Sequence, residues 1–191
     1  MELSSTQALP VSQAIAWAAL NDTSLLQQAI PGCEGITEIG ENDYEVIVVA
    51  AIGPVKAKFK GKLKLNDITP PTSYTLAFEG QGGAAGHGKG SAEVRLESTG
   101  ENETTLHYTA HATVGGKIAQ IGSRLIDMAA QKMAKEFFEK FTAVLIERQA
   151  PPPSESDGSI VDDAESTDEG DGGAGGDGQK KGWFKKLIGK G

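Results

Sequence analysis

The segment GPVKAKFKGKLKLNDI, residues 53–68, decides the fold class of this chain. Between Val55 and Leu65, lysines occupy every second position, and mostly apolar residues fill the positions between them. Successive side chains of a β-strand point to opposite faces, so this pattern predicts a long strand with one buried face and one solvated face. Such strands are typical of antiparallel sheets that pack one face on a core. The alternating lysines are Lys56, Lys58, Lys60, Lys62 and Lys64.

The same alternation recurs on both sides of this segment. The run YEVIVVAAI, residues 44–52, is joined to the lysine strand through Gly53-Pro54, where proline favours a turn or a bulge. Further runs follow at residues 74–78, 92–96 and 106–114, with Gly, Pro or Asn clusters between them. Together with a strand at the N-terminus, these segments predict one curved antiparallel sheet of about seven strands.

Two regions have helical periodicity instead. Between Pro10 and Pro31 we expect two short helices, the second capped by Asp22. Residues 117–148 predict one long helix with a wide apolar stripe, in which Gly122 would allow close approach to the sheet. A curved sheet needs a cover on its apolar face, and only this helix is long enough to supply it. The predicted fold class is therefore α+β.

The stretch EGQGGAAGHGKGS, residues 79–91, resembles a phosphate-binding loop. However, Gly90 stands where such a loop needs Ser or Thr, and the residues that follow alternate as a strand rather than forming a helix. We therefore expect no nucleotide or nucleic-acid site here. A connection with so few side chains predicts a mobile hairpin tip, which could gate a cavity or dock on a partner.

Composition divides the 191 residues into three parts. Residues 1–149 are long enough to form one domain with its own core. Residues 150–179 contain nine acidic residues and no basic one, and their few apolar residues predict a disordered linker. Residues 180–191 contain five lysines and no acidic residue. The formal net charge of −8 thus conceals a basic C-terminal segment behind an acidic linker.

Several functions are disfavoured by what the sequence lacks. Cys33 is the only cysteine, which excludes an intrachain disulfide and a cysteine-based metal cluster. His107 and His111 share the solvated face of a predicted strand, so we expect no metal site from them. The N-terminus does not match a signal peptide, and no run of about 18 apolar residues predicts a membrane span.

Four segments carry a resemblance to a known family: residues 29–36 (AIPGCEGI), 52–65 (IGPVKAKFKGKLKL), 88–96 (GKGSAEVRL) and 114–141. In these segments and in element order, the chain resembles the helix-grip superfamily of START-type lipid carriers, polyketide cyclases and birch-pollen-allergen-like proteins. Within it, the sequence is similar to the G-subunit family of carbon monoxide dehydrogenase. The resemblance implies a non-catalytic accessory protein that places aerobic molybdenum carbon monoxide dehydrogenase at the inner face of the cytoplasmic membrane. It implies no cofactor.

The resemblance also implies an apolar cavity between the sheet and the long helix, although a solid core would need similar residues. A quinone or a lipid is the expected ligand. A cyclase or dehydratase using the same cavity is the alternative, and it would require a catalytic acid or base there. Tyr108 is the only polar group among the expected wall residues: Phe59, Leu63, Leu76, Phe78, Val94, Leu96, Tyr108, Leu125, Met128, Met133 and Phe137.

The C-terminal sequence KKGWFKKLIGKG, residues 180–191, has the pattern of an interfacial membrane helix. Its apolar residues would lie along one side and its lysines around the other. Docking in a groove of a partner protein is the alternative. The expected membrane-binding residues are Lys181, Trp183, Phe184, Lys185, Lys186, Leu187 and Ile188. The lysines of residues 56–64 should form a solvated face or protect a sheet edge, unless they bind an acidic partner, an anionic membrane or the acidic linker.

Overall fold

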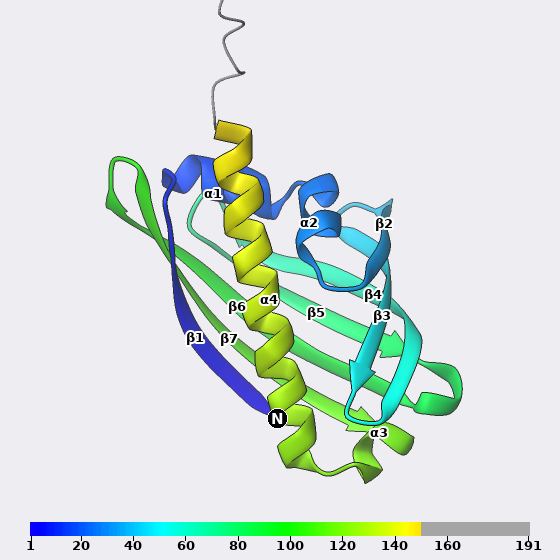
Figure 1. Cartoon of the computed structure of the whole chain (residues 1–191). Helices are drawn as coiled ribbons and strands as arrows, with labels where there is room; N and C mark the ends of the chain where they lie inside the picture. The colour runs from blue at the N-terminus through cyan, green and yellow to red at the C-terminus, as the bar shows by residue number, and fades with distance from the viewer. Residues whose placement is uncertain (150–191) are drawn as a thin grey trace, which may run out of the picture. The chain divides into compact units, whose positions relative to one another are not determined.

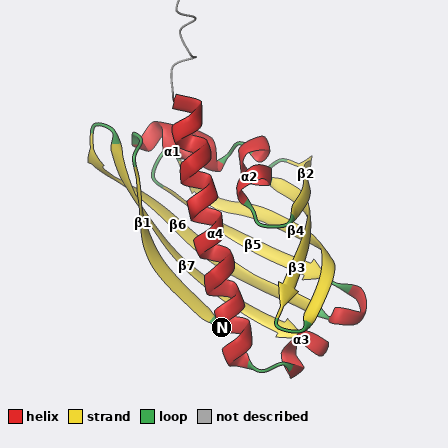
Figure 2. Ribbon diagram, viewed as in Figure 1, coloured by secondary structure: helices red, strands yellow, loops and turns green. Residues whose placement is uncertain are grey.

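Seven antiparallel strands form a single sheet in the order β1-β7-β6-β5-β4-β3-β2 (Figures 1 and 2). The computed structural model of the chain describes residues 1–149. Helices α1 and α2 lie between β1 and β2 in the sequence, and these two strands occupy opposite edges of the sheet. Strands β2 to β7 form a meander, and β7 pairs with β1. The strands are β1 (Glu2–Leu9), β2 (Cys33–Gly40), β3 (Asp43–Ile52), β4 (Val55–Thr69), β5 (Ser73–Gln81), β6 (His87–Gly100) and β7 (Glu103–Gly115).

The lysine-rich segment forms β4, the longest strand, and its burial alternates as predicted. β4 pairs with β3 on one side and β5 on the other, so the suggestion that it protects a sheet edge is wrong. Its lysines pair with acidic residues of β2 and β3, as in Lys58–Glu34 at 2.7 Å and Lys60–Glu45 at 3.0 Å. These pairs are exposed, so they contribute little to stability but offset much of the positive charge on the outer face.

The long C-terminal helix α4 (Ser123–Gln149) crosses the inner face of the sheet, as Figure 1 shows. The prediction of one continuous helix from Lys117 is wrong, because α3 (Lys117–Gln120) ends before Gly122. Gly122 has a φ of +94°, which breaks the helix, and a Cβ added there would meet no atom within 4 Å. This glycine therefore supplies a turn between two helices rather than a close contact with the sheet.

The two short helices α1 (Gln13–Leu20) and α2 (Thr23–Ala29) form as predicted. The Asp22 carboxylate caps α2 by accepting hydrogen bonds from the backbone N–H of Ser24 at 2.8 Å and of Leu25 at 3.1 Å. Arg148, near the end of α4, forms an ion pair with the same carboxylate. The hydrogen bond from the Ser24 side chain and that from Arg148 hold the pKa of Asp22 well below its usual value. Asp22 thus connects α2 to the far end of α4.

The glycine-rich stretch forms a shorter connection than we expected. β5 continues to Gln81 and β6 begins at His87, so only residues 82–86 connect them, with a short 3-10 helix, η1 (Gly83–Ala85), between the strands. A Cβ at Gly90 would lie 2.1 Å from the carbonyl oxygen of His111, and one at Gly82 would lie 2.4 Å from the Phe59 ring. These glycines therefore permit close packing of strands and side chains.

Candidate ligand-binding cavity

An apolar cavity of about 390 Å³ lies between the inner face of the sheet, α2 and α4. Strands β3 to β7 supply its floor, and Met133, Ala134, Phe137 and Phe138 of α4 supply its roof. This volume falls in the lower part of the range of small-molecule sites, roughly 300–1,000 Å³. The remaining wall residues are Leu3, Leu20, Asn21, Thr23, Leu26, Ile30, Pro31, Ile36, Tyr44, Val46, Leu63, Leu65, Tyr74, Leu76, Ala92, Val94, Leu106, Tyr108 and Ala110.

The structure brings six of the predicted wall residues together around this cavity. They come from four strands and from α4, and the strand residues share the inner face because their positions alternate as in β4. The residues are Leu63, Leu76, Val94, Tyr108, Met133 and Phe137. Whether they bind a ligand stays a prediction.

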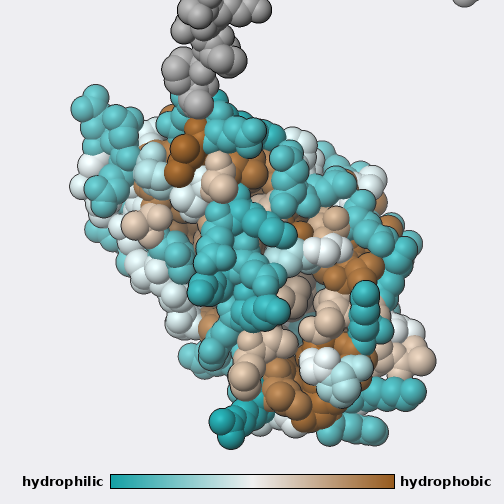
Figure 3. Space-filling view, in the orientation of Figure 1, coloured by the Kyte–Doolittle hydropathy of each residue, from teal (hydrophilic) through white to brown (hydrophobic). Residues whose placement is uncertain are grey.

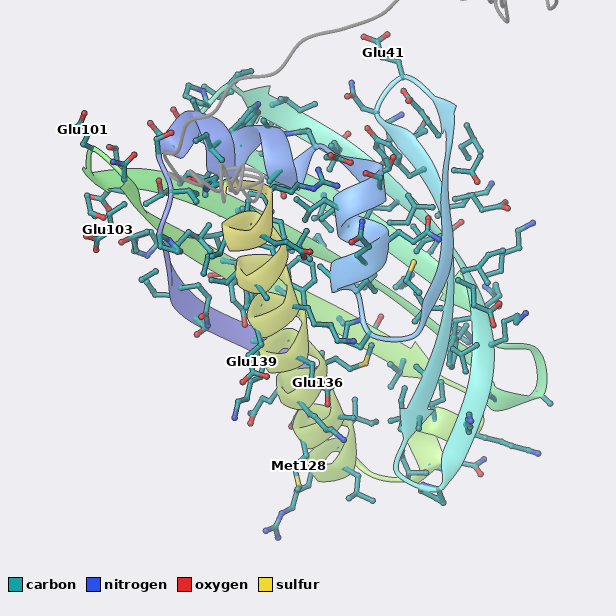
Figure 4. All side chains as sticks on the ribbon, turned by 45° about the horizontal axis from the view of Figure 1, so that its top comes forward. Glu41, Glu101, Glu103, Met128, Glu136 and Glu139 are labelled. Atoms are coloured by element: carbon teal, nitrogen blue, oxygen red, sulfur yellow. The ribbon has the colours of Figure 1, made fainter. Side chains whose placement is uncertain are left out.

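Two of the other predicted residues point into solvent from the first turns of α4. Leu125 is 43% exposed and Met128 is 57% exposed, and Met128 extends away from the sheet in Figure 4. At 3.6 residues per turn, Met128 lies about 140° around the helix from Met133, which faces the cavity. The wide apolar stripe therefore does not mark one inward face.

The remaining three predicted residues lie outside the wall of this cavity. Leu96 is 1% exposed within the main core. Phe59 packs in a second cluster with Ile118 and Ile126, beneath the start of α4. Phe78 lies opposite Gly90 on β6, one inward position beyond Leu76. The sequence periodicity predicted that these residues face inward, but it could not predict how far along the strand each lies from the cavity.

The hydroxyl of Tyr108 is not a free polar group in the cavity. The ring stacks on Phe138 with centroids 5.2 Å apart, and the side chain of Ser5 on the neighbouring strand interacts with the hydroxyl. Burial raises the pKa of Tyr108, and the interaction with Ser5 partly offsets that rise. The ring of Tyr108 therefore contributes surface to the cavity, while its hydroxyl is engaged with β1.

Two further tyrosines line the cavity, and neither was among the predicted wall residues. Tyr74 is 6% exposed, and its ring contacts Trp17 edge-on with centroids 5.8 Å apart. Burial raises the pKa of Tyr74. Tyr44 lies nearer the surface, where burial and the nearby Glu38 raise its pKa. The alternation of residues 74–78 already placed Tyr74 on the inner face with Leu76, so its position could have been predicted.

The wall formed by the described residues has tyrosine hydroxyls as its only titratable groups. Outside the cavity, His107 lies 3.4 Å from Glu97 and His111 lies 3.5 Å from Glu2, on the outer face as predicted. Within residues 1–149, no three His, Cys, Asp or Glu side chains are grouped to hold a metal ion. The cavity is therefore suited to binding by apolar contact, with hydroxyl groups as its polar partners.

Apolar surface is also exposed where α3 meets α4, as Figure 3 shows. A Cβ at Gly53, in the β3–β4 turn, would lie 3.7 Å from Leu125, so this turn and the start of α4 are adjacent. Over the described residues, no helix has the length and apolar character needed to cross a bilayer. The residues predicted to bind the membrane, Lys181, Trp183, Phe184, Lys185, Lys186, Leu187 and Ile188, lie outside the described residues.

A curved antiparallel sheet that holds a long C-terminal helix against its inner face defines the helix-grip, START-like fold. A START superfamily protein from Mycobacterium smegmatis superimposes with a TM-score of 0.61 at 12% identity, covering 77% of this chain and 98% of that one. An aromatase/cyclase, ZhuI from Streptomyces sp. R1128, has a TM-score of 0.59 at 13% identity, covering 78% and 94%. At these identities the likeness concerns the fold alone.

The family is more specific than the fold. The chain belongs to the carbon monoxide dehydrogenase G-subunit (CoxG) family, whose sequence model matches residues 8–146. A conserved protein from Geobacillus kaustophilus is 31% identical, with a TM-score of 0.73, over 77% of this chain and 96% of that one. No curated protein matches the chain significantly. The family and fold predicted from the sequence are thus confirmed.

Proposed function

We propose that this protein is a non-catalytic carrier of an apolar small molecule, which it holds between the sheet and α4. The observation that carries this proposal is the cavity of about 390 Å³, whose wall is apolar apart from three tyrosines, Asn21 and Thr23. Removing apolar surface from water contributes about 25 cal/mol per Å². A ligand with little polar surface, such as a quinone or a lipid taken from the membrane, therefore suits this site.

Membership of the CoxG family supports a role beside carbon monoxide dehydrogenase. We propose that the protein recruits the aerobic molybdenum enzyme to the inner face of the cytoplasmic membrane. Electrons that leave a dehydrogenase need an acceptor, and quinones reside in the bilayer. A carrier of quinone at that surface would bring the enzyme and its acceptor together.

The C-terminal segment is the part of the sequence that we propose to bind the membrane. Burying Trp183, Phe184, Leu187 and Ile188 would contribute roughly 6–10 kcal/mol before costs. Each lysine near an anionic surface adds about 1 kcal/mol. Ordering roughly ten residues costs about 1–2 kcal/mol each, so the attachment should be reversible.

Vesicle sedimentation tests this membrane proposal. Full-length protein should sediment with anionic vesicles, and deletion of residues 180–191 should abolish sedimentation without changing the melting temperature of the domain. Exchange of Trp183 and Leu187 for serine should have nearly the same effect. High salt should weaken binding only in part, because the apolar contribution is not screened. If the truncated chain still sediments, the segment is not the membrane-binding element.

The alternative function is an enzyme of the cyclase or dehydratase type. The likeness in fold to an aromatase/cyclase keeps this possibility open, and a tyrosine is the only wall residue that could transfer a proton. The variants Tyr108→Phe and Tyr74→Phe together separate the two functions. A carrier should lose affinity at most, whereas an enzyme that uses either hydroxyl should lose turnover in the corresponding variant.

Mass spectrometry of organic extracts tests the carrier proposal most directly. Protein purified from its native host should release a stoichiometric apolar molecule, and a variant with a smaller cavity should release less. Leu76→Phe is suitable because Leu76 lines the cavity. Leu125→Phe is the matched control, because Leu125 is 43% exposed outside it. Extracts that contain no small molecule in any preparation would contradict the proposal.

A further inference from the structure

Tyr74 is the most deeply buried tyrosine of the cavity wall, and no hydrogen bond to its hydroxyl is found within residues 1–149. Tyr74 is 6% exposed and lines the cavity from β5. Burial is the sole cause of its raised pKa, with no hydrogen bond contributing. Within residues 1–149, however, no fully buried polar side-chain atom lacks a hydrogen-bond partner. The hydroxyl of Tyr74 therefore retains a small accessible surface, and the cavity is the space that this residue borders.

The other two tyrosines of the wall differ from Tyr74 in this respect. The hydroxyl of Tyr108 is engaged with Ser5, and Tyr44 lies nearer the surface beside Glu38. The ring of Tyr74, in contrast, is fixed by its edge-on contact with Trp17 of α1. Tyr74 thus provides a positioned hydrogen-bond donor in an otherwise apolar part of the site.

We infer that Tyr74 selects apolar molecules that carry a hydrogen-bond-accepting oxygen at the end that enters the cavity. This inference rests on the proposed carrier function and specifies its ligand. A ligand that fills the cavity displaces water from this hydroxyl, and a hydroxyl left without a partner costs free energy. A carbonyl or hydroxyl oxygen on the ligand accepts the bond from Tyr74 and removes this cost, whereas a hydrocarbon of the same shape leaves the cost in place.

The size of the cavity limits how much of a ligand the protein can enclose. A volume of about 390 Å³ is near the lower end of small-molecule sites, which run from roughly 300 to 1,000 Å³. This space accepts a substituted ring or a short alkyl segment, so a long hydrocarbon tail would have to extend outside it. The portion that the protein recognises is then the end next to Tyr74.

Equilibrium dialysis of the full chain against a matched pair of probes tests this inference. Duroquinone and durene share a tetramethyl-substituted six-membered ring, but only duroquinone carries carbonyl oxygens. The wild-type chain should bind duroquinone more tightly than durene. Tyr74→Phe should weaken duroquinone binding by about two- to twelvefold, while durene binding stays unchanged or becomes tighter. Tyr44→Phe and Tyr108→Phe allow the three wall hydroxyls to be ranked, and each should weaken duroquinone binding less than Tyr74→Phe does. A third probe, 1-decanol, carries a hydroxyl oxygen on an alkyl chain. Tighter binding of 1-decanol than of duroquinone would indicate a lipid ligand, and the reverse would indicate a quinone.

The outcomes separate this inference from the carrier proposal. If duroquinone and durene both bind, and Tyr74→Phe changes neither affinity, Tyr74 does not select the ligand although the cavity binds apolar molecules. If no probe binds to any variant, the carrier proposal itself fails and the inference fails with it. If Tyr74→Phe weakens durene and duroquinone equally, the effect is one of cavity shape and the inference is wrong. An unchanged melting temperature of Tyr74→Phe shows that the variant is folded.

Discussion

The strongest test of the cavity compares the same substitution at two leucines on the inner face of the sheet. Leu96 on β6 is 1% exposed and belongs to the main core, whereas Leu76 on β5 packs beside that core and lines the cavity. Leu→Ala in a protein core costs about 2–5 kcal/mol, and the cost rises with the void that it leaves. The two positions therefore separate a filled core from a space that already exists.

At Leu96, packed side chains surround the lost methyl groups on every side. We expect Leu96→Ala to lower the free energy of unfolding by about 3–5 kcal/mol. At Leu76, one side of the residue already faces open space, so fewer contacts are lost and Leu76→Ala should cost about 1–2.5 kcal/mol. Urea denaturation followed by circular dichroism measures both values, provided that the m-value is unchanged.

Larger side chains should give the same ordering of effects, with Leu96 again the more sensitive position. Leu96→Phe should overpack the core and cost about 1–3 kcal/mol. Leu76→Phe should be nearly neutral, because the ring extends into the cavity. Equal costs at the two positions, for both the smaller and the larger residue, would refute the claim that an open cavity lies beside Leu76.

Three further predictions concern single side chains. Gly90→Ala should lower the melting temperature, because its Cβ would lie 2.1 Å from the His111 carbonyl oxygen, whereas Gly80→Ala should have a smaller effect because no atom lies within 4 Å. Because the folded pKa of Asp22 is lowered, its carboxylate stabilises the fold fully above the unfolded pKa of about 3.9, and this stabilisation is lost as the pH falls toward the folded pKa. Asp22→Asn should therefore flatten the fall in the free energy of unfolding below pH 4. Urea denaturation at a series of acidic pH values measures this. Tyr74→Phe should leave the melting temperature unchanged or raise it, since no hydrogen bond to its hydroxyl is found in the described part of the chain. Tyr108→Phe should lower the melting temperature slightly, because Ser5 interacts with the Tyr108 hydroxyl.

Strand positions were predictable because burial alternates with a period that can be seen in the sequence. The lysines of β4 show this most clearly, since every one of them is exposed. The same periodicity placed Tyr74 and Leu76 on one face. It could not show which inner positions border the cavity and which are packed, because that depends on where α4 crosses the sheet.

The helix was harder to interpret for a different physical reason. Apolar residues such as Leu125 and Met128 occupy exposed positions in α4, so its stripe is wider than the surface that it buries. Gly122 interrupts the helix through a positive φ, a conformation that the sequence pattern does not distinguish from a close contact. The glycines at 82 and 90 raise the same ambiguity, since a glycine can indicate either freedom or crowding. Only the neighbouring atoms decide which applies.

The position of β1 has a consequence for how the chain matures during translation. Its partner is β7, with Glu2 opposite His111 and Leu9 opposite Thr104. Synthesis proceeds at about 5–20 residues per second, so β1 leaves the ribosome roughly 5–20 s before β7 does. During that interval, Leu9 and Val11, both fully buried in the folded domain, have no sheet to pack against. Strand β1 is therefore made well before its partner strand but is among the last elements to find its place, and its apolar residues are a target for a nascent-chain chaperone in the meantime.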